Sequence, residues 1–531
     1  YKRQVYTMLI TVIKILCAVT YAAAALLTGR FFIHMFQLNS YKPKVHIKWM
    51  FKNRRGYTDL TCCSCALMAM LSAVLGDSFP QPLMLLYPVI LLIFALSNLP
   101  KKQYKIPLKY TARIKRLIVT CAVIMLVPII LLFTSLPALA AFDMTLLFLL
   151  LEPWLILLAN LINRPVELAI NRHYIDDAKR ILASCPNLTV IGITGSFGKT
   201  SVKYFLDSLL SVKYNVLKTP GNFNTPLGVV KTVRGSLRAT HDIFLCEMGA
   251  KNVGDIKEIC DIVHPKHGII TSVGPMHIES FKTIENVQKT KFELADALPS
   301  DGMLFLNFDC DIIRDANHPH PAVHYGIDDH SGYYVSGLKI SEKGSEFRVT
   351  APSGESCDYK TPLIGRHNVL NICGAIAVAN SLRISLEELR PAVRRLESVP
   401  HRLQLINRGD YTVIDDAYNS NPSGAKAALE TLSMAEGMKI LVTPGMIELG
   451  GMEYELNREF GEEAAAVCDY VALVGEKQTK PIADGLLSAG YPENKLFVAQ
   501  SLDEAMKKVY SIESGGRRKI ILLENDLPDN Y

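Results

Sequence analysis

The sequence predicts a multi-domain chain: an N-terminal helical transmembrane domain, a central α/β domain and a C-terminal doubly wound α/β domain. Its 531 residues exceed one ordinary domain. Hydrophobic residues make up 49% and mean hydropathy is +0.18, yet the long apolar stretches all end near residue 163. Short apolar runs then alternate with helical patterns, as in parallel α/β sheets. The expected parts are the transmembrane domain 1–163, a connector 164–187, the central domain 188–402 and the C-terminal domain 403–531.

Five apolar stretches of the first part are close to the length that spans a bilayer. They are residues 7–29, 60–76, 82–99, 117–136 and 138–162. The connections 41–59 and 101–116 are rich in Lys and Arg, whereas 77–81 and 137–141 contain neither. The positive-inside rule therefore predicts an outside N-terminus, with both basic connections and everything after residue 163 in the cytoplasm.

The charged residues and cysteines of this part are interpreted as features of a membrane domain. The net charge of +6 comes from its short basic stretches, which favours a membrane surface over nucleic acid as the partner. Lys14 and Glu152 lie within apolar stretches. We expect the Lys14 side chain to extend to the outer membrane–water interface, whereas a functional and a structural role are equally expected for Glu152. Cys62, Cys63 and Cys65 have no His or second Cys pair nearby, so packing is favoured over metal binding.

A glycine-rich loop follows the first predicted strand of the central domain. Leu188–Thr194 predicts a buried strand and Val202–Leu210 a helix, with Gly-Ser-Phe-Gly-Lys-Thr-Ser between them. In such a loop the backbone amides and the helix N-terminus hold phosphates, Lys199 adds positive charge and the Thr200 hydroxyl reaches Mg²⁺. The expected phosphate-binding residues are Gly195, Ser196, Gly198, Lys199, Thr200 and Ser201.

The loop departs from the general nucleotide-binding pattern at one position. That pattern has Gly five residues before Gly198, where this chain has Ile193. The shorter form Thr-Gly-Ser-Phe-Gly-Lys-Thr, ending at Thr200, resembles the Mur ligase family. These enzymes join amino acids or dipeptides to a growing cell-wall peptide, and the resemblance extends from about residue 187 to the end.

Further segments match the family in its own order, and the resemblance implies their roles. Thr219–Gly228 looks like the glycine–asparagine loop, and Glu247 matches a Mg²⁺ ligand. His277 matches the ligand of a second Mg²⁺. Lys291 matches the lysine that carries a carbamate, and Lys289 is a neighbouring candidate for the same role. The alternative is that this lysine has no such role and is an ordinary surface residue.

The resemblance continues into the nucleotide-binding residues of the later segments. The run Gly-Arg-His-Asn-Val-Leu-Asn contains Asn368 and Asn371 and looks like the helix start that contacts adenine. Arg402 matches an arginine that reaches the phosphates from the linker. Asp416 and Tyr418 belong to Asp-Asp-Ala-Tyr-Asn-Ser-Asn-Pro, which closely matches the members that add D-alanyl-D-alanine; there they sit at the ribose and near the nucleotide.

The C-terminal part is predicted to be a second doubly wound unit. Its expected strands are Thr412–Ile414, Lys439–Val442, Tyr470–Val474, Leu496–Ala499 and Lys519–Leu523. Residues 332–364 predict a short β segment of the central domain.

The resemblance implies a bacterial, ATP- and Mg²⁺-dependent ligase, and the predicted topology places its catalytic domains on the cytoplasmic side of the cell membrane. A substrate carboxylate takes the γ-phosphate of ATP to form an acyl phosphate, and the amine of an amino acid or dipeptide then displaces phosphate. Closure of the last domain would exclude water from this intermediate. The implied catalytic residues are Lys199, His277, Lys291 and Arg402, and the implied metal-binding residues are Thr200, Glu247, His277 and Lys291.

Two departures bear on the substrates. Transmembrane helices stand where the family has a domain that grips a UDP-linked precursor, which favours a membrane-held carboxylate substrate such as a polyprenyl-linked peptide. Thr443–Gly450 and Leu523–Asp529 also differ from the family's late substrate-binding segments, and the acidic second segment suits a cationic group better than a free carboxylate.

Three alternatives stay open. They are a diverged D-alanyl-D-alanine-adding ligase that uses the soluble UDP-linked precursor, a membrane-linked poly-γ-glutamate synthase, and an ATP-binding scaffold of a membrane complex. Intact Lys199, Glu247, His277 and Lys291 argue against the scaffold, because a nucleotide sensor does not need a second metal site.

Overall fold

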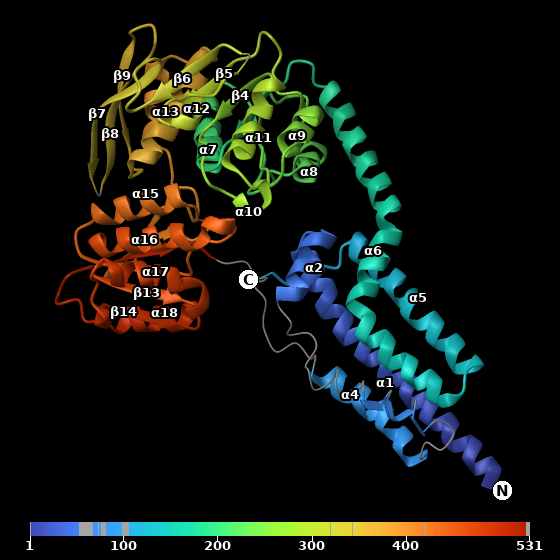
Figure 1. Ribbon diagram of the computed structural model, residues 1–531. Helices are drawn as coiled ribbons and strands as arrows, with labels where there is room; N and C mark the ends of the chain where they lie inside the picture. The colour runs from blue at the N-terminus through green and yellow to red at the C-terminus, as the bar shows by residue number, and fades with distance from the viewer. Residues whose placement is uncertain are drawn as a thin grey trace. The chain divides into compact units, whose positions relative to one another are not determined.

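The computed structural model describes most of the chain as two compact units, Tyr1–Arg172 and His173–Leu527 (Figure 1). The described residues are 2–52, 67–68, 70–72, 74–75, 81–97, 106–318, 320–341, 343–418 and 420–526.

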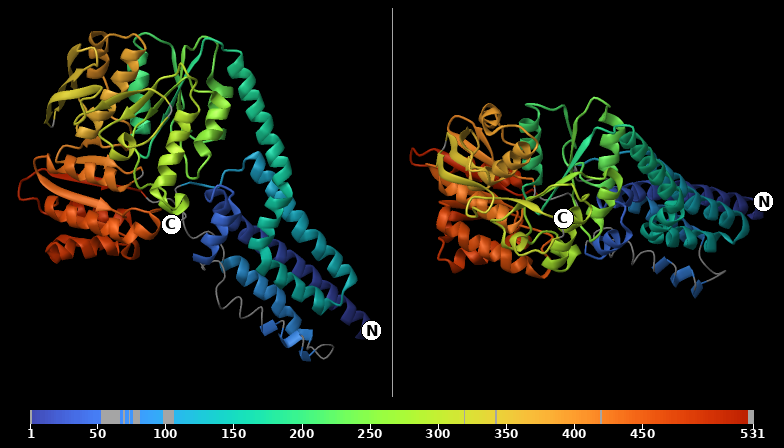
Figure 2. Two further views of the ribbon diagram at one scale, coloured as in Figure 1. Left: turned by 45° about the horizontal axis from the view of Figure 1, so that its top comes forward. Right: turned by 90° about the horizontal axis from the view of Figure 1, so that it is seen from above.

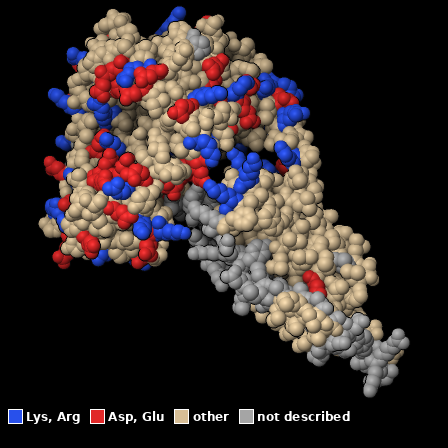
Figure 3. Space-filling view, viewed as in Figure 1, with Lys and Arg blue, Asp and Glu red and all other residues tan. Residues whose placement is uncertain are grey.

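The first unit is a bundle of apolar helices. Its elements are α1 (Lys2–Leu38), α2 (Pro43–Lys52), the 3₁₀ turn η3 (Gln81–Leu85), α4 (Leu86–Ser97), α5 (Ala112–Ser135) and the first part of α6 (Ala138–Ala183). The helix α1 packs along α4, and Tyr21, Tyr87 and Phe142 are fully buried in the interior. On the face seen in Figure 3, the described surface of this bundle is mostly uncharged.

Three of its helices are long and apolar enough to cross a membrane within the described ranges: Thr7–Leu38, Ala112–Ser135 and Ala138–Ala183. They contain three of the five predicted stretches. The stretch 82–99 corresponds to a shorter apolar helix, Leu83–Ile93, and 60–76 lies largely outside the described residues, as do Cys62, Cys63 and Cys65. Membrane crossing and the number of spans stay predictions.

The described parts of the two basic connections, residues 41–52 and 106–116, lie at the same end of the first unit. The Gln37 side chain donates to the Lys109 carbonyl (2.9 Å) and accepts from the Lys109 amide (3.0 Å), which ties α1 to the second connection. Nε2 of His34 lies 2.8 Å from the Ile106 carbonyl, and the Arg113 guanidinium stacks over Tyr41 at 3.9 Å. The positive-inside rule expects both basic connections on the same side of the membrane, and therefore at the same end of the bundle.

The two charged residues predicted within the bundle have different surroundings. Lys14 donates to the Phe133 carbonyl over 2.8 Å. Glu152 is 1% exposed beside Gly29, where an added Cβ would lie 2.7 Å from Glu152 Oε1. Gly29 therefore makes room for this carboxyl group between α1 and α6.

The helix α6 runs unbroken from Ala138 to Ala183 through Pro153 and Pro165, so it includes most of the predicted connector 164–187. The part of α6 from His173 on belongs to the second unit, where Ala178 is fully buried. Each proline removes one helix hydrogen bond without ending α6.

The middle domain, the first half of the second unit, is built on one large sheet. The strand order is β2-β3-β1-β4-β5-β6-β7-β8-β9, parallel up to β7 and antiparallel from β7 to β9. The strands are β1 (Thr189–Thr194), β2 (Val216–Lys218), β3 (Ile243–Glu247), β4 (His267–Ile270), β5 (Leu304–Asn307), β6 (Ala322–Gly326), β7 (Tyr333–Ser341), β8 (Gly344–Thr350) and β9 (Ser356–Thr361). The predicted β segment 332–364 is thus an antiparallel extension of the sheet.

Helices cover both faces of this sheet (Figures 1 and 2). They are α7 (Lys199–Leu210), α8 (Pro226–Ser236), α9 (Asp255–Val263), α10 (Ile278–Phe281), α11 (Ile284–Asp296), α12 (Asp311–Arg314), α13 (Arg366–Ser381) and α14 (Leu386–Arg394). The helices α7, α13 and α14 share one apolar core, and α8, α9 and α11 share the other. This is a doubly wound arrangement, whose ligand sites lie beyond the carboxyl ends of the strands.

The C-terminal domain has a smaller sheet of order β10-β11-β15-β12-β13-β14. Its strands are β10 (Gln404–Asn407), β11 (Tyr411–Asp416), β12 (Met438–Thr443), β13 (Tyr470–Val474), β14 (Leu496–Ala499) and β15 (Lys519–Glu524). The helices are α15 (Pro422–Ser433), α16 (Glu453–Val467), α17 (Glu476–Ser488) and α18 (Leu502–Ser511), with 3₁₀ turns η4 (Gly450–Met452) and η5 (Glu493–Lys495). All five predicted strands are present, and β10 is an additional antiparallel edge strand.

Candidate active site

The glycine loop between β1 and α7 has the backbone that its sequence requires. Gly198 has φ 81°, a left-handed conformation that glycine adopts without strain, and it stands immediately before the first turn of α7. The Lys199 ammonium donates to the carbonyls of Gly195 (2.5 Å) and Ser196 (3.1 Å), so it lies over the loop. Burial lowers the pKa of Lys199 to about 8.

The segment that follows β4 holds this loop in place. Ser196 donates its amide to the Ser272 carbonyl (2.8 Å) and its hydroxyl to the Gly274 carbonyl (3.1 Å). The Phe197 amide donates to the Ser272 hydroxyl over 2.8 Å. These bonds fix the loop where β1 and β4 end side by side, before any ligand is considered.

A carboxylate at the end of β3 faces the first turn of α7. Glu247 Oε1 accepts from the Thr200 hydroxyl (3.2 Å) and from the Asn224 side chain (3.1 Å). Burial alone would raise the pKa of Glu247, but the neighbouring Lys203, Lys199 and Asn224 outweigh it and hold this pKa below its ordinary value. Ionised carboxylate and hydroxyl oxygens are the ligands that Mg²⁺ prefers, so this pair fits the predicted metal.

Lys203 is a site residue that the sequence analysis missed. Its side chain is fully buried, with Nζ 2.8 Å from Glu247 Oε2 and donating to the Gly221 carbonyl over 2.7 Å. It therefore connects α7, the Glu247 carboxylate and the glycine–asparagine loop. Its spacing could have identified it, because Lys203 follows Lys199 by one helical turn and both ammonium groups therefore lie on the same side of α7.

Lys291 is the better placed of the two candidate lysines on α11. Lys289 is exposed, whereas Lys291 is 3% exposed and forms no hydrogen bond or ion pair with any residue that the structure describes. Burial, followed by the charge of Lys199, lowers the pKa of Lys291 to about 7. A buried amine that is partly neutral at physiological pH is suited to carbamate formation, which requires the uncharged form.

His277 lies at the start of α10 with a left-handed backbone, φ 54°. Its Nδ1 donates to the Glu448 carboxylate, which comes from the loop after β12 in the C-terminal domain. Burial lowers the pKa of His277 in spite of this carboxylate. The imidazole is therefore available in the neutral form that binds metals.

The two asparagines of α13 occupy different places. Asn368 donates to the Ile364 carbonyl, just before the start of its own helix, over 2.8 Å. Asn371 lies against the glycine loop, since a Cβ added to Gly198 would be 2.8 Å from Asn371 Oδ1. Asn371 is thus beside the predicted phosphate-binding residues; Asn368 contacts the loop that precedes α13.

Arg402 and Asp416 meet at the junction between the two domains. The Arg402 guanidinium stacks over the Tyr418 ring at 4.5 Å, and Asp416 Oδ1 accepts from the Leu403 amide over 3.2 Å. Asp416 is also the register partner of Glu524 on β15, which was not predicted. Burial raises the pKa of Asp416 to about 6 and that of Glu524 well above its ordinary value, so the pair retains a proton near neutral pH.

The structure places the predicted residues in three groups, with Asn368 outside them. Gly195, Ser196, Gly198, Lys199, Thr200, Ser201, Glu247 and Asn371 surround the start of α7, and Arg402, Asp416 and Tyr418 lie near the domain junction. His277 and Lys291 belong to α10 and α11, which pack together. Among the described residues no three His, Cys, Asp or Glu side chains form a ready metal cluster, so a metal here would also need hydroxyl, carbamate or ligand oxygens.

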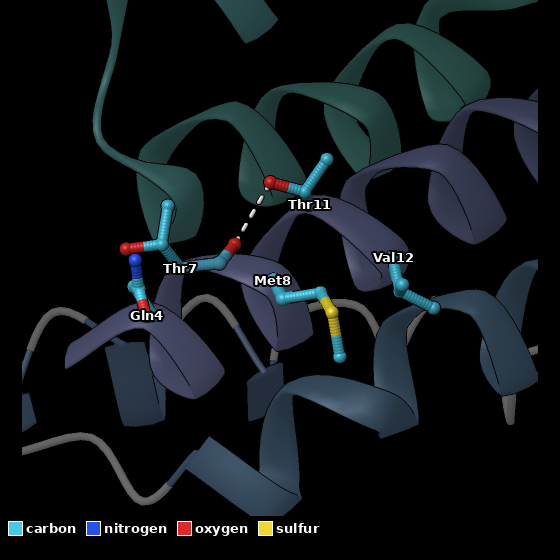
Figure 4. A pocket seen from close by; sticks show the side chains of 5 residues that line it. All are labelled: Gln4, Thr7, Met8, Thr11 and Val12. Carbon is cyan, nitrogen blue, oxygen red and sulfur yellow. Dashed lines mark hydrogen bonds between the residues drawn. The ribbon is translucent and has the colours of Figure 1, made fainter. Parts of the chain in front are cut away.

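Two hollows outside this site lack its convergent groups. One lies along a single face of α1 and is lined by Gln4, Thr7, Met8, Thr11 and Val12 (Figure 4). The other lies over β7, β8 and β9, where Arg348 pairs with Asp358 and Lys360 with Glu346. Neither hollow holds a predicted site residue.

Comparison with family models identifies both domains of the second unit. Residues 193–379 match the Mur ligase middle domain, and residues 401–523 match the Mur ligase glutamate ligase domain.

Curated relatives include two UDP-N-acetylmuramoyl-tripeptide–D-alanyl-D-alanine ligases. The Bacillus subtilis protein is 32% identical over 275 residues, 51% of this chain and 59% of the relative. The Escherichia coli protein is 29% identical over 390 residues, 69% of this chain and 84% of the relative. The chain thus aligns with little more than half of the first of these relatives.

Solved structures agree with this grouping. MurF from Acinetobacter baumannii superposes with a TM-score of 0.62 at 26% identity, covering 68% of this chain and 78% of that one. The MurF ligase from Thermotoga maritima, solved in complex with ADP, has a TM-score of 0.60 at 24% identity, covering 67% and 80%, which supports the shared fold.

Proposed function

Since the chain belongs to the Mur ligase family, whose members are ATP-dependent ligases that form amide bonds, we propose that it is a membrane-anchored ligase of this type acting on a cell-wall precursor. The carboxylate substrate is held in the membrane, and the second substrate is the amine of an amino acid or dipeptide. The observation that carries the proposal is the contact of Thr200 with Glu247 in front of a glycine loop that Lys199 covers.

The residues around this contact suit ATP and Mg²⁺. Thr200 and Glu247 offer hydroxyl and carboxylate oxygens to one Mg²⁺, and His277 with a carbamate on Lys291 would hold a second. Bound ATP and Mg²⁺ would supply the phosphoryl group that activates the carboxylate as an acyl phosphate, and the charge that stabilises its transfer. Lys199 and Arg402 would place positive charge beside the phosphates, and Asp416 and Tyr418 would orient the nucleotide.

Membrane anchoring rests on the first unit. Three described helices have the length and hydropathy of membrane spans, and the described parts of both basic connections lie at one end of the bundle. This arrangement favours a cytoplasmic second unit, where ATP is available, and a carboxylate substrate that arrives at the bilayer. The alternative substrate is the soluble UDP-linked tripeptide with D-alanyl-D-alanine, favoured by the names of the curated relatives.

The test is phosphate release from ATP and Mg²⁺ by the full chain in detergent, offered panels of cell-wall precursors and amines. We expect release only when a lipid-linked carboxylate and an amine are both present, with a new amide detected by mass spectrometry. Lys199→Ala and Lys291→Ala should each lower this release at least about a hundredfold. Release with the UDP-linked tripeptide and D-alanyl-D-alanine alone would favour the alternative, and nucleotide binding without release for any pair would contradict both.

A further inference from the structure

Glu448 brings a side chain of the C-terminal domain to a predicted metal-binding residue of the middle domain. Its carboxylate accepts from His277 Nδ1 and from the Lys251 ammonium, with the two Lys251 distances 2.9 and 3.2 Å. Its backbone carbonyl also accepts from the Glu279 amide over 3.2 Å. Three groups of the middle domain therefore contact this one residue, which the sequence analysis assigned only to a divergent loop.

The backbone of Glu448 is held in a conformation that residues with side chains rarely adopt. Its φ is 64°, and the loop that carries it is tied down by the Asn525 side chain, which donates to the Gly445 carbonyl over 2.6 Å. Such a conformation persists only when the surrounding contacts fix it, and it is concentrated at functional positions. The loop presents the carboxylate to His277 rather than to solvent.

A carboxylate on Nδ1 has a defined consequence for an imidazole. It accepts the ring N–H, which fixes the tautomer and leaves the Nε2 lone pair for a metal. A histidine without such a partner can rotate and can exchange its tautomer. Carboxylates of this kind are common behind metal-binding histidines, and their removal weakens metal binding about tenfold to a hundredfold.

We infer that Glu448 is the positioning residue of His277, so that the second metal site is complete only when the C-terminal domain lies against the middle domain. This inference rests on the proposed function, which assigns His277 to that metal. It gives domain closure a specific effect: the domain that closes also prepares one metal ligand. The ion pair with Lys251, whose side chain is 53% exposed, is a secondary contact, because exposed pairs contribute little.

The experiment is a Mn²⁺ titration of the full chain in detergent, loaded with a non-hydrolysable ATP analogue and followed by the electron paramagnetic resonance of free Mn²⁺. The variants are Glu448→Ala, Glu448→Gln, His277→Ala and Lys251→Met. Glu459→Gln removes an exposed carboxylate from α16 of the same domain and is the matched control. Affinity for the analogue and the first Mn²⁺ reports that each variant is folded.

We expect two Mn²⁺ per wild-type chain, with the weaker site about tenfold to a hundredfold weaker again in Glu448→Ala and in His277→Ala. Glu448→Gln keeps an acceptor oxygen and should lose less, while Lys251→Met and Glu459→Gln should bind both ions as the wild type does. If affinity for the second Mn²⁺ falls in His277→Ala but not in Glu448→Ala, the inference about Glu448 is overturned while the proposed function stands. Loss in Lys251→Met equal to that in Glu448→Ala would also overturn it, because the ion pair would then be the cause. An unchanged second site in His277→Ala would remove the metal assignment itself.

Discussion

Replacing Lys203 by methionine tests the electrostatics of the site most sharply. The side chains of Lys203 and Glu247 are 0% and 2% exposed, and 2.8 Å separates Nζ from Oε2. Methionine fills similar volume but leaves a buried carboxylate without its cation. Breaking a buried pair in this way costs about 3–5 kcal/mol of folding stability, and the variant also loses the hydrogen bond to the Gly221 carbonyl.

The pH dependence of this loss has a definite sign. In the wild type the pKa of Glu247 lies below its ordinary 4.5, so its contribution to stability is present above that pH and is lost as the pH falls. In Lys203→Met burial would raise this pKa, and the contribution would be lost as the pH rises. The difference between the two proteins should therefore be greatest at pH 7–8 and should shrink toward about pH 5.

The assay is unfolding of the full chain in urea, without nucleotide, followed by labelling of Cys246, which is fully buried beside Glu247. Tryptophan fluorescence is unsuitable, because both tryptophans, Trp49 and Trp154, lie in the first unit. The double variant Lys203→Met/Glu247→Gln should recover about 1–3 kcal/mol, since the uncompensated charge is gone. A single variant within about 0.5 kcal/mol of the wild type at pH 8, or a difference that grows as the pH falls, would refute the reasoning.

Three further changes have expected outcomes. Gly198→Ala places a Cβ 2.8 Å from Asn371 Oδ1 at a φ of 81°, so we expect ATP affinity to fall at least about tenfold by calorimetry; unchanged affinity would mean that the loop adapts. Glu524→Gln removes the carboxyl that shares a proton with Asp416. Because the pKa of Asp416 is raised to about 6, the stability that its carboxyl contributes below about pH 4 is lost as the pH rises through 6. The variant should therefore gain about 1 kcal/mol in urea unfolding at pH 8 and almost nothing at pH 4, and a larger gain at pH 4 than at pH 8 would contradict this. In Gly29→Val the added Cβ would lie 2.7 Å from Glu152 Oε1, so the midpoint temperature of the first unit's thermal transition, followed by tryptophan fluorescence, should fall by several degrees. Gly235→Ala adds a Cβ in open space and should leave this temperature unchanged. Equal midpoint temperatures in the two variants would contradict the close packing of Gly29.

Local patterns were sufficient to predict the sheet framework. The strands β1, β12 and β13 are short apolar runs in which most residues are buried, and their bounds agree with the predicted runs to within two residues. The strand β10 was missed because it is an antiparallel edge strand with alternating half-buried and exposed residues, Gln404–Asn407, which form no continuous apolar run.

Long-range contacts explain what the sequence could not predict about the site. Glu448 and His277 are 171 positions apart, and Glu524 and Ser420 are 104 apart, so no spacing rule connects them. The choice between Lys289 and Lys291 was also open, because the motif alone fits both. Burial of Val287, Phe292 and Leu294 on α11 shows which face of that helix is inward, and Lys291 lies on the buried side.

The most direct test of the central claim follows one oxygen atom. The full chain, with ATP, Mg²⁺ and an amine, is given a lipid-linked precursor whose carboxylate carries ¹⁸O at both oxygens, and the released phosphate is analysed by mass spectrometry. Activation as an acyl phosphate predicts one ¹⁸O in each phosphate released, together with an equal amount of new amide, and neither product from Lys199→Ala. Phosphate without ¹⁸O, or phosphate released without amide, would contradict the assignment of this chain as an amide-forming ligase.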